Sequence, residues 1–402
     1  MYLYLYLYLY MNLMTTEQKV IIMKLKGMSL FANVGIAENL LHECDVEVVL
    51  ANELIAKRAE FYKHVFPNSE MIQGDITDKN IFNTILNKAM EYDIDFIIAT
   101  PPCQGMSTAG KQDKLDPRNQ LISYAIDMIK KVKPKYVMLE NVPQQLKTKI
   151  KVNGKEMLIP NYIKSELSEL YNFNKNQVIN SADYGVPQSR ERSIFLLARK
   201  DLNFTWEVPQ KESKVITLQD AIGHLPELDP LIYDIPYEEH LKVFPLYEER
   251  LKKAMEISKW HIPPEHVYRQ VYAMVHTPSG QSAFSNENIK HKPTTEKGTL
   301  VKGFKNTYKR QSWDKPAYTV TMYNRTIGSQ ENVHPGRPTG IIDDGVMTYT
   351  DARVLTVYEL MIVMSIPLDW NIPEWSTEHF IRQVIGEGIP PLLVKKIFEQ
   401  IV

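Results

Sequence analysis

The chain has 402 residues, of which 44% are hydrophobic, so it is long enough for one large domain and a smaller one, each with its own core. Its formal net charge of -1 gives no overall attraction to a polyanion, so any nucleic-acid site must depend on local clusters of Lys and Arg. The only two cysteines, Cys44 and Cys103, exclude a disulfide framework and a CxxC zinc pair. We therefore expect no metal site and a reducing cytoplasm.

The first ten residues, MYLYLYLYLY, form a two-residue repeat. A membrane span needs roughly 20 apolar residues, and a secretory signal needs a basic leader and a cleavage site, so the repeat fits neither. Residues 1–19 are interpreted as a low-complexity tail, and no membrane association is expected. The alternative is an added edge strand, because the repeat has a period of two.

From residue 20 to residue 199, short apolar runs alternate with amphipathic stretches, in the order MSLFANVG, ENLLHEC, VEVVLANE, a helical run up to residue 65, DFIIATPPC and YVMLENV. This rhythm is typical of parallel strands joined by crossover helices and predicts an α/β fold. Continuous apolar runs such as residues 96–99 suit strands that are buried on both faces. Since ligands of open parallel sheets sit beyond the carboxyl ends of the strands, we expect the chemistry in the loops that follow them.

The pattern changes after the segment TLQDAIGHLPELDP, where Tyr, Lys, Trp and Pro become frequent and the strand–helix rhythm stops. Helix-like sequence returns in LTVYELMIVMSIP and PPLLVKKIFEQIV. We therefore predict a large domain over residues 20–225, a smaller inserted domain over residues 226–340, and a return segment over residues 341–402 that completes the large domain.

The segment ATPPCQGMS places Cys103 directly after a predicted buried strand. A free thiol has a pKa near ~8.5 and needs a helix start or a positive charge to become a reactive thiolate. Two prolines stiffen the entry to this loop and Gly105 frees its exit, which suits a nucleophile on a mobile loop. The alternative is a buried structural cysteine, and that is our interpretation of Cys44 in ENLLHECDVEV.

Two further motifs carry ionisable side chains. Glu140 ends the predicted strand YVMLE, where a carboxylate can hydrogen-bond a ring nitrogen and share a proton with it. In QSRERSIFL, Arg190 and Arg192 precede a predicted strand; residues two apart on an extended chain point to the same side, so both are expected to face phosphates and base edges. The alternative for Glu140, taken alone, is an ordinary carboxylate that caps backbone N–H groups in a loop. The alternative for the arginines is a solvated charged turn.

In this order, the three motifs resemble those of the cytosine-5 DNA methyltransferase family, namely its PCQ nucleophile loop, its ENV motif and its QxRxR motif. The resemblance extends from residue 29 to residue 391 and breaks only in the middle segment. It implies a Rossmann-like, S-adenosylmethionine-dependent methyltransferase sheet with a smaller inserted target-recognition domain. Within the family, the resemblance is to the bacterial restriction-modification type.

The resemblance also implies a mechanism. Cys103 would add to carbon 6 of cytosine, Glu140 would hold or protonate ring nitrogen 3, and Arg192 would help to fix the ring, with Arg190 counted beside it as catalytic. Carbon 5 would then attack the methyl group, and loss of the carbon 5 proton would expel Cys103. Because this cannot happen inside a stacked duplex, the cytosine must be flipped into the pocket.

The segment SLFANVGIAE resembles the family's first motif, in which Phe31 packs against S-adenosylmethionine and Gly35 keeps the turn tight. The chain departs from the family here. Ser29 replaces the usual acidic residue, and Asn33 and Ile36 replace two usual glycines. These departures bear on the geometry around the methionine part of the cofactor.

The other cofactor residues follow later strands. Glu53, after VEVVLAN, is expected to accept hydrogen bonds from ribose hydroxyls, and Asp75, in QGDI, from the adenine amino group. Near the end, RQVIGEGIPP resembles the family's last motif, in which Gly386 would start a helix; Glu387 replaces the usual Asn and would bring a charge near the cofactor carboxylate. The remaining residues assigned to the cofactor site are Asn33, Leu54, Ile76, Pro102 and Leu121.

The middle segment matches the family's target-recognition region in position only. Residues 287–315 hold eight Lys and Arg against three Asp and Glu, and this excess of five positive charges suits phosphate contact, with a solvated basic surface as the alternative. The residues assigned to double-stranded DNA are Gln104, Ser107, Gln188, Lys302, Lys305 and Lys309. We expect a monomer in the cytoplasm, associated with the nucleoid, whose partner restriction endonuclease acts separately.

Three other functions share some of these features. An RNA cytosine-5 methyltransferase could share the motifs, but its tRNA branch typically carries a Cys-Phe-Thr tripeptide, and this chain has no third cysteine. A catalytically silent DNA-binding subunit is disfavoured by the intact Cys103, Glu140 and Arg192, although the departures at Asn33 and Glu387 leave it open. A nicotinamide oxidoreductase would need GxGxxG after the first strand, which is missing.

Overall fold

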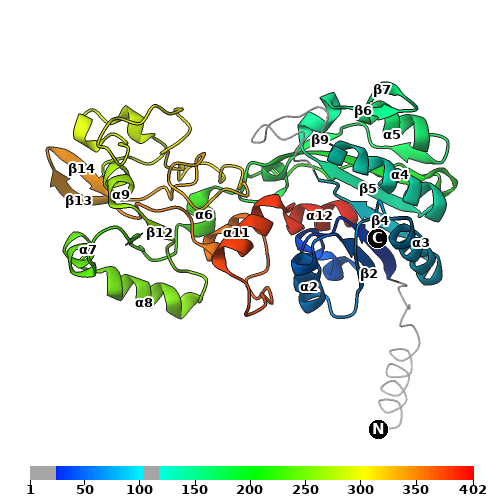
Figure 1. Ribbon diagram of the computed structural model, residues 1–402, viewed down its shortest axis with the longest axis horizontal. Coiled ribbons are helices and arrows are strands. Elements are labelled where there is room, and N and C mark those ends of the chain that lie inside the picture. The colour runs from blue at the N-terminus through cyan, green and yellow to red at the C-terminus, as the bar shows by residue number, and fades with distance from the viewer. Residues whose placement is uncertain (1–23, 103–116) are drawn as a thin grey trace, which may run out of the picture.

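The computed structural model describes residues 24–102 and 117–402, which form two lobes lying side by side (Figure 1). The predicted tail of residues 1–19 lies outside this range, as do Cys103, Gln104 and Ser107. The larger lobe is built on a central sheet, and the smaller lobe consists mostly of loops and short helices (Figure 1). Within the described residues, no helix is long and apolar enough to cross a membrane.

The central sheet has eight strands, and its neighbours run in the order β3-β2-β1-β4-β5-β10-β8, with β9 also paired to β10. All pairings from β3 to β5 are parallel, whereas β10 runs antiparallel to β5, β8 and β9. The predicted α/β fold is thus confirmed, with a mixed sheet. The strands are β1 (Leu25–Leu30), β2 (Val46–Glu53), β3 (Glu70–Gln73), β4 (Phe96–Ala99), β5 (Tyr136–Asn141), β8 (Tyr171–Phe173), β9 (Val178–Asn180) and β10 (Glu191–Arg199).

Crossover helices join the parallel strands, as the rhythm of the sequence predicts. Helix α3 begins where the Asp78 carboxylate accepts hydrogen bonds from the backbone N–H groups of Asn80 and Ile81. Instead of an amphipathic helix, ENLLHEC forms two short 3-10 turns. The elements of this lobe are η1 (Ile36–Glu38), η2 (Leu41–Cys44), α2 (Ala56–Val65), α3 (Lys79–Tyr92), η3 (Pro117–Gln120), α4 (Leu121–Val132), η4 (Pro143–Lys147), β6 (Lys149–Val152), β7 (Lys155–Leu158), α5 (Ile159–Leu167), η5 (Ser181–Tyr184), η6 (Lys200–Leu202) and α12 (Pro391–Phe398).

Both faces of the sheet are covered. Along β4, Ile97 and Ala99 pack into a hydrophobic cluster with residues of α3, α4 and α5, whereas Phe96 and Ile98 pack into a second cluster that includes Phe398 of α12. This alternation explains why the strand reads as one continuous apolar run, because each face has its own apolar neighbours. It also brings the last helix of the chain onto the sheet formed by the first 200 residues (Figure 1).

The smaller lobe contains few regular elements, and buried charges lie beside its hydrophobic cluster. The Arg353 guanidinium, fully buried, donates to Asp351 and Glu359 at 2.8 Å each, and the buried Arg310 donates to the backbone carbonyls of Met274, His334 and Asp351. The elements of this lobe and of the segment leading back are α6 (Leu218–Ile222), β11 (Leu231–Ile232), α7 (Tyr237–Val243), α8 (Tyr247–Ile257), β12 (Glu265–His266), α9 (Tyr268–Val275), η7 (Ala283–Ser285), η8 (Ile289–His291), β13 (Pro338–Asp343), β14 (Val346–Tyr349), α10 (Val357–Val363) and α11 (Glu378–Glu387).

The hairpin of β13 and β14 bears on where the middle segment ends. These strands pair antiparallel, so the predicted boundary at residue 340 falls inside β13. His276, at the end of α9, contacts Asp343 of the hairpin at 3.0 Å. The chain therefore leaves the smaller lobe only after β14.

Glu38 is a buried carboxyl group in the larger lobe. It accepts hydrogen bonds from the hydroxyl of Tyr62 and from Ser29, the residue that stands where the family has an acid. Burial raises the pKa of Glu38 from 4.5 to about 7, because water no longer solvates the charged form, and the two hydrogen bonds only partly oppose this.

This pKa makes stability depend on pH. A carboxyl group whose pKa is raised on folding stabilises the fold below its unfolded pKa, and that contribution is lost as the pH rises through the folded value, here about 7. Between about pH 5 and about pH 7, the Tm of the wild type should fall by a few degrees more than that of Glu38→Gln, whose amide does not ionise. Differential scanning calorimetry measures both. An equal fall in the two proteins would contradict this account of Glu38.

Candidate active site

The loops predicted to carry the chemistry meet at one edge of the sheet. Strands β1, β2, β4 and β5 are parallel, so their carboxyl ends lie together. Because β10 is antiparallel to β5, its first residues reach the same edge, where Ile194 pairs with Glu140 and Ser193 pairs with Asn141. The topology thus joins the LENV and QSRER motifs, which lie about 50 residues apart in the sequence.

Glu140 and Arg192 form a buried ion pair at this edge. The Arg192 Nε atom lies 2.9 Å from Glu140 Oε1, and each side chain is 11% exposed. Burial raises the pKa of Glu140 above its usual value of 4.5, while the positive charges of Arg192 and Arg190 and the hydrogen bond from Arg192 act in the opposite direction. A carboxyl group poised in this way can hold a proton at a ring nitrogen.

Asn141 lies at the same edge and is not among the residues that the motifs assign to the site. Its buried side chain donates to the backbone carbonyl of Pro101 at 2.9 Å and so ties the end of β5 to the segment that leads into Cys103. From the other side, the Thr100 hydroxyl donates to the carbonyl of Phe31 at 3.2 Å. The polar Asn directly after Glu140 in the ENV motif was the available signal.

Arg190 joins three stretches of backbone. It is 1% exposed and donates to the carbonyls of Val320 at 2.6 Å, Gly386 at 2.8 Å and Gly388 at 2.7 Å. Arg192 instead pairs directly with Glu140, on which Arg190 acts through its charge while its hydrogen bonds to these carbonyls hold the backbone. Arg190 therefore has a positioning role that links β10 to the return segment.

Gln188 is fully buried as well. Its amide nitrogen donates to the Val363 carbonyl, and its amide oxygen accepts from the backbone N–H of Val320. Both polar ends of this side chain are therefore used inside the protein. Gln188 does not reach the surface in this conformation, and its contact with DNA stays a prediction.

Cys44 is buried, as predicted. It lies between η2 and the packed α12, and burial raises the pKa of its thiol to about 11. A thiol with so high a pKa is almost wholly protonated near neutral pH and is a poor nucleophile. The predicted nucleophile, Cys103, is thus the other cysteine, which lies outside the described residues.

The loop after β1 is a tight turn with three residues in the left-handed region. Phe31, Asn33 and Gly35 all adopt positive φ angles, of 61°, 51° and 78°. At Gly35 a side chain is excluded, because a Cβ atom there would lie 2.3 Å from the ring of Phe66. Asn33 adopts the left-handed conformation that Asn tolerates better than most residues, which explains how it can replace a glycine. Ile36, the other replacement, is buried in the core.

Glu53 and Asp75 stand at the ends of the next two strands. Glu53 Oε2 accepts from the backbone N–H of Asn33 at 2.9 Å, so the predicted ribose carboxylate touches the β1 loop. Asp75 is exposed, and its carboxylate accepts from the backbone N–H of Thr77. Among the other assigned residues, Leu54 is 57% exposed, Pro102 and Leu121 are half-buried, and Ile76 is packed in the core.

Glu387 comes close to these residues, although not in the way the family motif implies. Gly386 lies in the last turn of α11 and does not start a helix, so that expectation is wrong; the next helix begins at Pro391. A Cβ atom at Gly386 would lie 2.2 Å from the carbonyl oxygen of Thr321, so close backbone packing is the reason for this glycine. Glu387 forms an ion pair with Arg58 at 2.7 Å and accepts from Asn33 at 3.1 Å.

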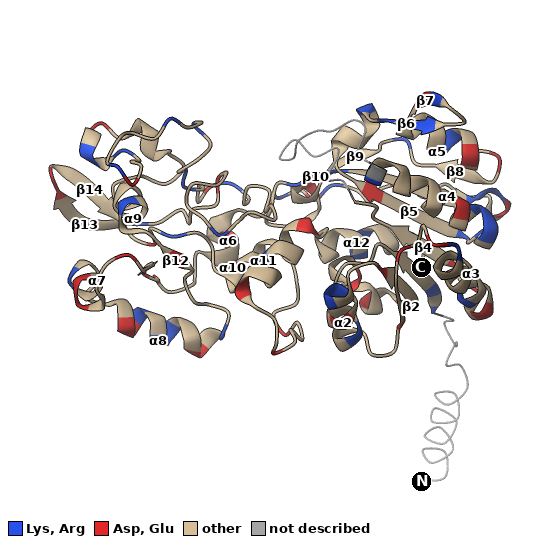
Figure 2. Cartoon of the chain, viewed as in Figure 1, with Lys and Arg blue, Asp and Glu red and all other residues tan. Residues whose placement is uncertain are grey.

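The basic excess of residues 287–315 is only partly on the surface. Lys302 and Lys305 are exposed, but Lys309 pairs with Glu331 at 2.7 Å and Arg310 is fully buried. Between the two exposed lysines, Phe304 is 81% exposed. Over the whole molecule, basic and acidic residues are interspersed on both lobes (Figure 2). Lys290, Lys297 and Lys315 of this segment are exposed as well, so most of its lysines reach the surface.

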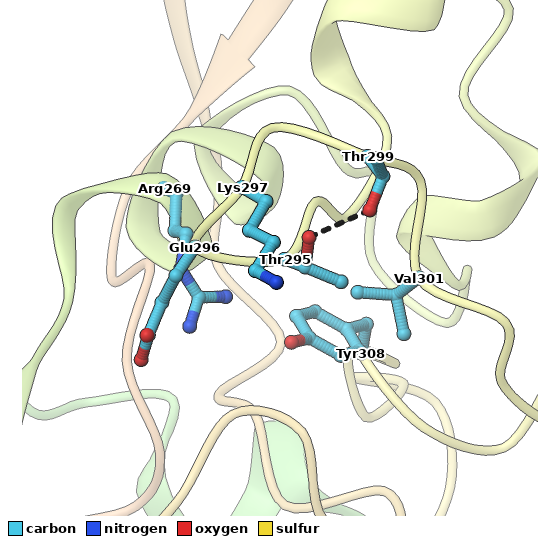
Figure 3. A pocket seen from close by; sticks show the side chains of 7 residues that line it. All are labelled: Arg269, Thr295, Glu296, Lys297, Thr299, Val301 and Tyr308. Carbon is cyan, nitrogen blue, oxygen red and sulfur yellow. Dashed lines mark hydrogen bonds between the residues drawn. The ribbon is translucent and has the colours of Figure 1, made fainter.

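A hollow of about 550 Å³ is lined largely by residues of this segment (Figure 3). Its walls come from α9 and from the 294–300 turn, where the backbone of Thr294 pairs with that of Leu300. Arg269 and Lys297 give it a cationic lining, and Tyr308 supplies an aromatic ring. The residues that line it are Arg269, Thr295, Glu296, Lys297, Thr299, Val301 and Tyr308.

The fold and the sheet-edge residues define a class of protein. Residues 25–402 match the family model described as C-5 cytosine-specific DNA methylase, and the chain belongs to this family. It is a DNA (cytosine-5-)-methyltransferase, and the resemblance of its motifs is confirmed.

Individual relatives cover nearly the whole chain. The Type II methyltransferase M1.HgaI of Avibacterium volantium is 42% identical over 94% of this chain and 98% of the relative. The Type II methyltransferase M.DdeI of Desulfomicrobium norvegicum is 26% identical over 93% of this chain and 88% of the relative. Among solved structures, a mutant of Spodoptera frugiperda DNMT2 superposes with a TM-score of 0.57 at 15% identity, covering 93% of this chain and 98% of that one, which shows a shared fold.

Glu140 is the described residue on which we expect turnover to depend most. Glu140→Gln keeps the shape of the side chain but removes its ability to exchange a proton, so the methyl-transfer rate should fall by about 10²-fold or more. Single-turnover methylation of a duplex substrate measures this rate. Glu91→Gln, an exposed carboxylate on α3 paired with Lys88, is the control and should leave the rate unchanged. Full activity of Glu140→Gln would refute the assignment.

Proposed function

We propose that this chain methylates carbon 5 of cytosine within a short specific site of duplex DNA, using S-adenosylmethionine and covalent addition of Cys103 to a flipped base. The observation that carries the proposal is the buried Glu140–Arg192 pair at the sheet edge where β4 leads toward Cys103. A protein that only binds duplex DNA does not need a buried carboxyl group with a raised pKa at this edge, whereas a catalyst can use it to exchange a proton.

In the proposed reaction, the Cys103 thiolate forms a bond to carbon 6, while Glu140 supplies a proton or a hydrogen bond to ring nitrogen 3, which stabilises the electron pair pushed toward carbon 5. S-adenosylmethionine, when bound, supplies a methyl group activated by a sulfonium. Carbon 5 would accept this methyl group as the S–CH3 bond breaks, with the thioether sulfur of S-adenosylhomocysteine keeping the electron pair of that bond. The carbon 5 proton would then leave to a base, and the electron pair of the C–H bond would restore the ring double bond and expel the Cys103 thiolate. Arg192 holds Glu140 through the ion pair.

The residues at the sheet edge fit the cofactor. Glu53 and the backbone of Asn33 meet there, and each carboxylate oxygen of Glu53 uses one lone pair on a backbone N–H, which leaves acceptor capacity for ribose hydroxyls. The buried Asn33 Oδ1 and Glu387 Oε1 atoms have no donor among the described residues, as expected where a polar ligand group belongs. Asp75, exposed beyond β3, is proposed to accept from the adenine amino group.

We propose that the smaller lobe reads the DNA sequence, as the target-recognition region of the family does. Its support is local: exposed Lys302 and Lys305 flank the exposed ring of Phe304, a combination that suits phosphate contact beside an apolar contact in a groove. The neighbouring hollow with Arg269 and Lys297 lies on the same segment (Figure 3). The bases that are read do not follow from these contacts.

The names of the relatives support a biological setting. M1.HgaI and M.DdeI are both named Type II methyltransferases, and we propose that this chain likewise protects host DNA beside a separately acting restriction endonuclease. It would act as a monomer on nucleoid DNA in the cytoplasm, because one lobe carries the chemistry and the other the proposed DNA contacts.

A covalent trap tests the nucleophile. A duplex with 5-fluorocytosine at the target carries no removable carbon 5 proton, so wild-type protein should remain attached to it through Cys103. Cys103→Ser should lose both adduct and turnover, because a hydroxyl is a far weaker nucleophile at neutral pH. Cys44→Ala, which removes the buried thiol of high pKa, should keep both. Peptide mapping that finds the adduct on any other residue would overturn the mechanism.

The salt dependence of binding tests the smaller lobe. Replacing Lys302 and Lys305 by Gln should weaken binding to every duplex and lower the slope of log K against log salt by about two, because two phosphates no longer pair with a lysine. Lys309→Gln should change the slope less, because the charge of Lys309 is already paired with Glu331. Fluorescence anisotropy over a salt series measures the slopes. An unchanged slope in the double variant would place the phosphate-binding residues elsewhere.

A further inference from the structure

Three polar side chains from distant parts of the chain meet beside the β1 loop. Asn33 lies in that loop, Arg58 on the first turn of α2, and Glu387 at the end of α11. The Glu387 Oε2 atom accepts from Arg58 Nη2 at 2.7 Å and from Asn33 Nδ2 at 3.1 Å. The side chains of Arg58 and Glu387 are only 15% and 19% exposed, so solvent screens this ion pair less than a surface pair.

The contacts of Glu387 leave two oxygen atoms facing no donor. Both bonds to Glu387 end on Oε2, so Oε1 stays unpaired, and the amide of Asn33, oriented by that carboxylate, leaves Oδ1 unpaired. Both atoms are buried without a hydrogen-bond partner among the described residues. Two buried acceptors without donors cost free energy, so their persistence at one place calls for a group that donates to them.

The position of these atoms indicates which group donates. The backbone N–H of Asn33 is bonded to Glu53 Oε2, so the two unpaired oxygens lie next to the carboxylate that we assign to the ribose of the cofactor. One oxygen is a carboxylate and the other an amide carbonyl, and both only accept hydrogen bonds. An ammonium group has three N–H donors and a positive charge, and it matches this pair, whereas a carboxylate would be repelled by Glu387.

We propose that Glu387 and Asn33 bind the α-ammonium group of the cofactor's amino-acid part, with Arg58 as the residue that positions Glu387. This inference rests on the proposed use of S-adenosylmethionine. Arg58 occupies one oxygen of Glu387 and turns the other toward the Asn33 carbonyl. Glu387, which replaces the family's usual Asn, thereby becomes a charged contact for the ligand. When no ligand is bound, the ion pair with Arg58 still compensates the charge of the Glu387 carboxylate.

Calorimetry with two ligands tests the proposal on the full chain. The probes are S-adenosylhomocysteine and its deaminated analogue, in which hydrogen replaces the α-amino group. The wild type should bind S-adenosylhomocysteine at least about tenfold more tightly than the analogue, as expected when a charge-assisted hydrogen bond is removed. In Glu387→Gln this ratio should drop by about tenfold, because S-adenosylhomocysteine loses affinity and the analogue does not.

Two further variants separate a contact with the ammonium from a general loss of structure. Glu53→Ala should weaken both ligands alike and leave the ratio at its wild-type value, since Glu53 is assigned to the ribose. Arg58→Gln should lower the ratio, and Arg58→Lys should recover part of it, because a lysine can still pair with Glu387. A ratio that is equal in Arg58→Gln and wild type would overturn the positioning role.

The outcomes for the wild type distinguish this inference from the proposed function. Equal affinity of the wild type for S-adenosylhomocysteine and the analogue would overturn the ammonium site and leave the methyltransferase proposal intact. Water would then be the donor to the two oxygens. A wild type that binds neither ligand would overturn the proposed cofactor together with this inference. A Glu387→Gln variant with the wild-type ratio would assign the ammonium contact to other residues.

Discussion

The antiparallel pairing of β10 with β5 is the constraint on which the site depends. If β10 ran parallel to β5, its first residues would lie at the opposite edge of the sheet, and Arg192 would be far from Glu140. The pairing instead sets Ile194 beside Glu140 and brings the guanidinium to 2.9 Å from the carboxylate. Removing a carboxylate from water costs several kcal/mol, so the buried Glu140 depends on this cation. Glu140 nevertheless keeps a raised pKa, and the site retains a group that can exchange a proton.

The same strand also holds the end of the chain in place. Arg190 donates to the carbonyls of Gly386 and Gly388 at the end of α11 and to Val320 in the segment before it. The last carbonyls of a helix have no partner within the helix, and at the buried end of α11 Arg190 supplies the donors. They also set where Glu387 stands, between two of the carbonyls that Arg190 holds. The QSRER motif therefore contacts both regions: Arg192 pairs with Glu140 at the sheet edge, and Arg190 binds the backbone on either side of Glu387, which contacts the β1 loop.

Much of the larger lobe could be predicted because its signals are local. The apolar run of β4 follows from residues adjacent in sequence, and so does the placement of Glu140 at a strand end. The confirmed family resemblance also rests on short motifs that need no knowledge of distant contacts. The smaller lobe could not be predicted in this way. Beside its hydrophobic cluster it buries Arg353 and Arg310, and a buried arginine cannot be told from a solvated one without its partners.

The sequence by itself determined the chemistry that is available: one thiol after a strand, one carboxylate at the end of the next strand, and arginines before a third. Tertiary structure alone decided how these groups are used. It separated Arg190 from Arg192, buried Gln188 among backbone partners, paired Lys309 with Glu331, and brought Arg58 to Glu387 across more than 300 residues of chain. The physical reason is that ion pairs and buried hydrogen bonds act over a few ångströms in space, whereas sequence patterns report only the neighbours along the chain.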